Sequence, residues 1–238
     1  SSTGLAISAE EMLKMAPPEV IRWLIMQPQP NRHIDFDPGL GLLNSVDKYD
    51  RLEQDYYKKE AEENSTRAFE LSQVENKIRG KSQTLPYRHL VTLVQSKNGY
   101  EEIVETLKRT GEIVDLDSYE NEQLNSRIEC IKGWLETQAP ENIKFKIKDT
   151  PPELEIDDNV SKRINEIKVK INSINWNPES IHDLFYELQE ENKTPAKDYF
   201  KIMYLIILGK ERGPRLGFFL STMEKDFVIK RLDNYLGP

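Results

Sequence analysis

The stretch that decides the fold is residues 17–53, which read PPEVIRWLIMQPQPNRHIDFDPGLGLLNSVDKYDRLE. Its first ten residues predict a helix from Pro18, because proline suits a first turn and apolar residues follow at three-to-four spacing. Pro28 and Pro30 end that helix, since proline lacks the amide proton that a helix interior needs. A second, longer helix is expected after the next Pro-Gly pair, where apolar residues again recur on one face.

Between these two helices, residues 33–37 alternate polar and apolar side chains, as in an extended segment. His33, Asp35 and Asp37 would share one side of it. We do not interpret them as a metal site, because such side chains lie roughly 6 to 7 Å apart, too far for one ion without bending. We expect a polar face of a packed segment.

Helical signals continue outward from this stretch. Ser8 and Glu11 have the spacing of a capping box, which predicts a short helix before Pro17. Residues 68–72 alternate and predict a brief strand. Beyond them, apolar residues at helical spacing predict a compact helical unit that ends before Pro140.

The pattern lapses between Phe145 and Asp158, so we place a domain boundary near Glu155. The last third is the most regular part, with a helical stripe formed by Val160, Ile164, Ile167, Ile171 and Ile174. Asn177 is expected to cap the next helix, and Gly209 to end the one after it. Two further short helices are expected around residues 216–223 and 226–235.

The length of 238 residues suits two or three modest helical units. No run approaches the ~20 apolar residues that span a bilayer, and no basic region followed by an apolar run indicates a secretory signal.

Cys130 is the single cysteine, so no internal disulfide can form and a reducing, cytoplasmic location is expected. The formal net charge of −8 means that any nucleic-acid surface must be local.

Catalytic signatures are absent from the sequence. It has no Gly-rich phosphate loop and no pair of histidines at helical spacing. His33, His89 and His182 are scattered, and histidines in such positions are more often structural than catalytic. We expect no catalysis, cofactor or metal within this chain.

One stretch differs from this background. Residues 210–219 read KERGPRLGFF, with two arginines and two glycines in a loop between helices, and Tyr204 lies just before them. Single-stranded RNA loops are recognised in this way, because splayed bases stack on aromatic or guanidinium planes while polar groups bond their edges. The alternative is a plain turn with solvated arginines, which composition alone favours.

At this point the chain resembles the C-terminal portion of class I lysyl-tRNA synthetases, over nearly its whole length. The resemblance rests on these blocks: Ser1 to Gly4, similar to the end of a Lys-Met-Ser-Lys-Ser signature; Pro17 to Arg22; Pro30 to Leu43 with Asp47, Tyr49, Asp50 and Arg51; Tyr87 to Gln95; Arg109 to Gly111; Trp134 to Glu141; Leu208 to Arg215; and Phe227 to Leu232.

The resemblance implies a mainly α fold in three parts. Residues 1–60 would be a small α/β region that contacts the tRNA stem, and residues 61–155 and 156–238 would be two α-helical cages, the second of which binds the anticodon. The implied stem-contact residues are Arg32, His33, Asp35 and Asp37. The implied tRNA-binding residues are Arg88, Tyr204, Arg212, Gly213, Pro214, Arg215, Leu216 and Phe219.

The resemblance also implies what this stretch lacks. Only Ser1 and Ser2 remain of the signature, and the N-terminal Rossmann catalytic domain that would bind ATP with Mg is absent, so this fragment should not activate lysine alone. The expected partner is tRNA(Lys). Two alternatives stay open: the anticodon-binding part of a glutamyl-tRNA synthetase, whose C-terminal end is more loosely similar, and a helical protein-interaction module.

Overall fold

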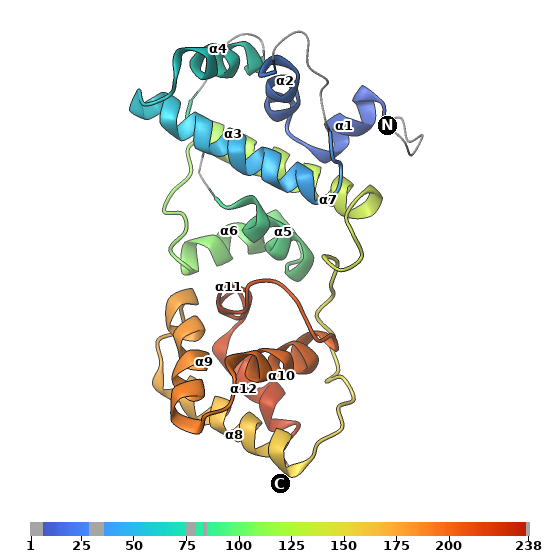
Figure 1. Ribbon diagram of the computed structural model, residues 1–238, viewed down its shortest axis with the longest axis vertical. Helices are drawn as coiled ribbons and strands as arrows, with labels where there is room; N and C mark the ends of the chain where they lie inside the picture. Colours follow the sequence, from blue (N-terminus) through green and yellow to red (C-terminus); the bar gives the residue numbers. More distant parts are fainter. Residues whose placement is uncertain (1–6, 29–35, 75–79, 83–84, 237–238) are drawn as a thin grey trace. The chain divides into compact units, whose positions relative to one another are not determined.

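The computed structural model describes residues 7–28, 36–74, 80–82 and 85–236. The chain divides into two compact units, Ser1–Glu141 and Asn142–Pro238, and each is described here by itself. The expected mainly α fold is confirmed, since the regular elements in these ranges are all helices (Figure 1). None of the helices in the described ranges combines the length and the apolar character needed to cross a membrane.

The first unit has seven helices in the residues that the structure describes. They are α1 (Ala9–Met15), α2 (Pro18–Met26), α3 (Leu40–Lys58), α4 (Glu63–Ser72), α5 (Tyr87–Ser96), α6 (Tyr100–Arg109) and α7 (Ser118–Thr137). The expected capping box is present, because Ser8 and Glu11 bond each other's backbone at the start of α1. Pro18 occupies the first turn of α2, as the sequence predicted.

Two polar contacts in the interior of this unit connect α7 with α3 and with Pro38, shortly before α3. Trp134 is 1% exposed, and its indole Nε1 donates to the Pro38 carbonyl oxygen at 2.7 Å. Arg127 of α7 forms a bidentate ion pair with Asp50 of α3, with Nη1 2.9 Å from Oδ2. Burial alone would lower the pKa of Arg127, but the charge and hydrogen bonds of Asp50 outweigh it and raise that pKa. This pair fixes the two helices against each other.

One expectation for the first unit needs correction. The brief strand predicted at residues 68–72 is wrong, because they form the end of α4, whose Ala68, Phe69 and Ser72 are buried at helical spacing. Asp37, an expected stem-contact residue, lies just before α3, where its carboxylate accepts the backbone N–H of Gly39 and of Gly41, each at 2.8 Å. These two hydrogen bonds give the Asp37 carboxylate a structural role at the start of α3. The contact of Asp37 with the tRNA stem stays a prediction.

Over residues 142–236, the second unit has five helices around one apolar core. They are α8 (Asp158–Ser173), α9 (Pro178–Asn192), α10 (Ala196–Leu208), α11 (Leu216–Ser221) and α12 (Lys225–Asp233). Ile164, Ile167 and Ile171 of the predicted stripe are buried in it. Asn177 caps α9 by accepting from Ser180 N at 2.8 Å, as expected.

Residues 142–157, which include most of the stretch where the sequence pattern lapses, have no helix but belong to the second unit. Phe145, Ile147 and Leu154 pack against its core. These apolar residues hold the segment against the second unit. Its lysine-rich and proline-containing composition had instead indicated a domain boundary near Glu155. The division into one stem-contact part and two cages stays a prediction.

Candidate nucleic-acid interface

The predicted RNA-binding stretch is the loop between α10 and α11 together with the first residue of α11; we call these residues, 209–216, the arginine loop. It begins at Gly209, whose φ of 67° is in the left-handed region, and whose N–H bonds the Leu205 carbonyl at 2.9 Å. Glycine tolerates this conformation because it has no Cβ. The predicted C-terminal cap is therefore confirmed, and it turns the chain out of α10 into the loop.

Tyr204 of α10 supports the loop from beneath. Its hydroxyl donates to the Pro214 carbonyl oxygen, and burial raises its pKa to about 12. Gly213 lies against the same side chain: a Cβ added there would lie 2.9 Å from Tyr204 Cδ1 and Cε1 and from Leu208 Cδ1. The position therefore requires glycine, and the loop has a defined path.

The acidic residue of the loop is neutralised within the unit. Lys201 Nζ lies 2.6 Å from Glu211 Oε1, and this hydrogen bond, with the lysine charge, lowers the pKa of Glu211. Arg212 and Arg215 are exposed, and neither forms a hydrogen bond or ion pair with the described part of the chain. Two guanidinium groups are thus left to bind an anionic or hydrogen-bonding ligand.

The aromatic and apolar residues at the end of the loop, expected to bind tRNA, are buried in the core of the unit. Phe219 is fully buried, with its ring 5.3 Å from that of Phe145 in an edge-on arrangement. Leu216 is also buried, at 6% exposure. These side chains anchor the end of the loop in the core, so Phe219 presents no face on which a base could stack in this conformation.

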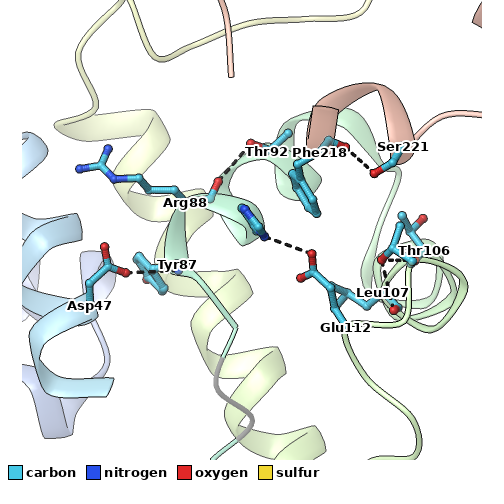
Figure 2. A network of polar contacts seen from close by, with 11 residues as sticks. Asp47, Tyr87, Arg88, Thr92, Thr106, Leu107, Glu112, Phe218 and Ser221 are labelled. Atoms are coloured by element: carbon cyan, nitrogen blue, oxygen red, sulfur yellow. Dashed lines mark hydrogen bonds and ion pairs between the residues drawn. The ribbon is translucent and has the colours of Figure 1, made fainter. Parts of the chain in front are cut away.

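Arg88, the remaining residue of the predicted tRNA-binding set, belongs to the first unit. It extends from α5 (Figure 2), and its Nη2 donates to Asn44 Oδ1 of α3 at 2.9 Å. It is exposed, so the guanidinium remains accessible. Among the other expected residues, Ser1, Ser2, Arg32, His33 and Asp35 lie outside the described residues.

Sequence reasoning missed two residues that shape this surface. Lys201, about one helical turn before Tyr204, neutralises Glu211, and no short sequence motif connects Lys201 with Glu211. Phe145, at the start of the stretch where the sequence pattern lapses, packs against Phe219 of α11. The alternation of apolar residues and lysines in residues 143–148 was the available signal for Phe145.

Comparison with protein families agrees with this geometry. Residues 1–75 match the family described as tRNA synthetases class I (K), and residues 137–236 match the anticodon binding domain family. The second match coincides with the second compact unit and includes the arginine loop. The first match makes this part of the chain similar to class I tRNA synthetases, and the second shows that the chain carries an anticodon-binding domain.

Curated relatives make the assignment more particular, because they are lysine–tRNA ligases. The chain is 38% identical to that of Picrophilus torridus over 238 residues, 39% identical to that of Thermoplasma acidophilum over 240, and 33% identical to that of Pyrococcus horikoshii over 238. These matches cover 97 to 99% of this chain, but the chain spans only 45 to 46% of the length of these relatives. The resemblance to class I lysyl-tRNA synthetase is confirmed.

Proposed function

We propose that this chain is the C-terminal part of a class I lysyl-tRNA synthetase that binds tRNA(Lys) and recognises its anticodon. The observation that carries the proposal is the arginine loop. It lies inside the anticodon-binding match and is supported by Tyr204 and the core. It also exposes the side chains of Arg212 and Arg215, which form no hydrogen bond or ion pair with the described residues.

Recognition would follow from the chemistry of the loop. Unpaired anticodon bases present hydrogen-bonding edges and flat faces, and guanidinium groups can bond the former and stack on the latter. Lysine anticodons are rich in uracil, whose carbonyl oxygens accept hydrogen bonds, so we assign Arg212 and Arg215 to uracil edges or phosphates. Gly213 and Pro214 would bring the backbone close to the bases, and Tyr204 would hold that backbone in place.

The activity of the whole enzyme would be the ligation of lysine to tRNA(Lys), with lysyl-adenylate formed from ATP and Mg. No group of three or more His, Cys, Asp or Glu in the described ranges is arranged to hold a metal ion. We therefore assign no step with ATP or Mg to these residues, and a Rossmann domain outside this stretch would supply them. The enzyme would act in the cytoplasm.

Binding of the chain to a tRNA(Lys) anticodon stem-loop tests this function. The control is a stem-loop whose central anticodon U is changed to C, and both are titrated across a salt series. We expect tighter binding to the lysine stem-loop and weaker binding as salt rises, because phosphate contacts release counterions. Equal affinity for the two stem-loops would contradict anticodon recognition.

A further inference from the structure

A second basic element lies beside the arginine loop, in residues 143–148, which read IKFKIK and which we call the lysine strap. Phe145 and Ile147 pack against the core of the second unit, whereas Lys146 and Lys148 are exposed. This alternation indicates extended backbone, in which same-side residues lie roughly 6.6 Å apart. The strap therefore directs a row of ammonium groups outward.

The strap is held in place by its backbone. Arg231 of α12 is buried, at 4% exposure, and its Nη2 donates to the carbonyl oxygens of Lys148 and Asp149 at 2.6 and 3.3 Å. Lys210 of the arginine loop donates its Nζ to the Lys144 carbonyl at 2.7 Å. These bonds occupy backbone carbonyls and leave the side chains of Lys146 and Lys148 projecting from a fixed chain.

The lysine strap and the arginine loop adjoin each other. A Cβ placed on Gly209 would lie 3.5 Å from both Cε and Nζ of Lys148, so this ammonium group lies at the start of the loop. The two segments are widely separated in sequence, but both run past the end of α10 (Figure 1). Together they form one continuous surface on the second unit.

Charge is concentrated on this surface. The strap and the loop carry six cationic residues and one carboxylate, Glu211, which is paired with Lys201. The whole chain has a formal net charge of −8, so this excess of positive charge is local. Neither Lys146 nor Lys148 forms an ion pair within the described part of the chain. A polyanion is the ligand that this arrangement favours.

We propose that the lysine strap binds the phosphate backbone of the RNA strand whose bases the arginine loop reads. Lys148 would contact a phosphate next to the bases at the loop, and Lys146 the following phosphate, because their spacing suits successive phosphates of an extended strand. Contacts of this kind position a strand and carry no sequence information. The inference rests on the proposed function, and it assigns to the strap the affinity that does not depend on base identity.

A structural role for Lys148 is the competing explanation. Its ammonium lies at the C-terminal end of α10, where a positive charge complements the helix dipole. Lys146 is one strap position further from Gly209 and has no such explanation. Single variants at the two positions therefore separate phosphate binding from stabilisation of the helix.

The test measures binding of the whole chain to the two anticodon stem-loops, with Lys146→Ala, Lys148→Ala and the double variant, across a salt series. Loss of one phosphate contact reduces the slope of log affinity against log salt by about 1. We expect each single variant to lower the slope by about 1 and the double variant by about 2. The preference for the lysine stem-loop should not change, and Lys146→Arg with Lys148→Arg should restore wild-type binding.

The matched control removes two exposed lysines elsewhere in the same unit, Lys162→Ala and Lys197→Ala, and should leave the slope unchanged. Lys197 is the second residue of α10 and lies about 17 Å along the helix from its loop end. If the wild-type chain discriminates the stem-loops but the strap variants keep its salt slope, the strap inference is overturned and the proposed function stands. If the wild-type chain binds neither stem-loop, both are overturned.

Discussion

Gly213→Ala should both destabilise the second unit and weaken RNA binding. The new methyl group would lie 2.9 Å from two ring carbons of Tyr204 and from Leu208 Cδ1. Carbon atoms pack best at about 3.5 to 4.0 Å, so either the side chains or the loop must move by roughly 0.6 to 1.1 Å. Leu208 is only 3% exposed, and Tyr204 is held through its hydroxyl bond to Pro214, so neither can move freely.

The loss of stability follows from the two ways to relieve this close contact, movement of the side chains or movement of the loop. Moving the ring breaks the hydroxyl bond to Pro214, which contributes about 0.5 to 1.5 kcal/mol, and overpacking a closed site generally costs about 1 to 3 kcal/mol. We therefore expect Gly213→Ala to reduce the free energy of unfolding of this unit by about 1 to 3 kcal/mol. Because the loop is displaced, affinity for the anticodon stem-loop should fall as well.

Urea unfolding followed by circular dichroism measures the first effect, and titration of a labelled stem-loop measures the second. Tyr204→Phe gives an internal control, since it removes the hydroxyl bond while keeping the ring. With Tyr204→Phe present, Gly213→Ala should cost less than it does alone, because the ring is then free to shift. A change in unfolding free energy below about 0.5 kcal/mol, with unchanged RNA affinity, would refute the proposed packing of the loop.

Three further predictions concern single residues. Arg215→Ala should weaken stem-loop binding by about 1 to 3 kcal/mol without changing thermal stability, as expected for an exposed base contact, and unchanged affinity would remove its assigned role. Arg127→Met should lower the free energy of unfolding by about 3 to 5 kcal/mol in urea titrations, because it leaves the Asp50 carboxylate buried without its partner; a loss below 1 kcal/mol would contradict the buried ion pair. Burial raises the pKa of the Cys130 thiol from 9.0 to about 12, which lowers its thiolate fraction roughly 1,000-fold at pH 8. Iodoacetamide should therefore label Cys130 slowly in the native chain and rapidly in urea, and equal rates would show that the thiol is exposed.

Signals that act over a few residues predicted the helices well. The capping box of Ser8 and Glu11, the cap at Asn177 and the glycine at 209 each specify a helix end through their own hydrogen bonding or backbone freedom, and each is found where expected. The alternation at residues 68–72 led to the wrong prediction of a strand. Its buried residues, Ala68, Phe69 and Ser72, also fit one face of a helix, and there Phe69 packs against Tyr49 and Tyr56. Tertiary contacts decided between the two.

Features that depend on distant partners were beyond the reach of the sequence. Asp50 and Arg127 are 77 residues apart, and neither has a local pattern that marks it as buried. The arginine loop was predicted as a surface loop with free arginines, and the structure places it so. The burial of Phe219 was missed because the sequence does not show that Phe145 packs against it. The assigned contacts with RNA stay predictions.

Photo-cross-linking most directly tests the central claim that the arginine loop reads the anticodon. A tRNA(Lys) stem-loop with 4-thiouridine at the central anticodon position would be irradiated with the chain, and the attached peptide identified by mass spectrometry. We predict cross-links within residues 209–216 that are lost when unlabelled lysine stem-loop competes and retained when the stem-loop with central C competes at the same concentration. Specific cross-links confined to the first unit, with none in the loop, would contradict the account.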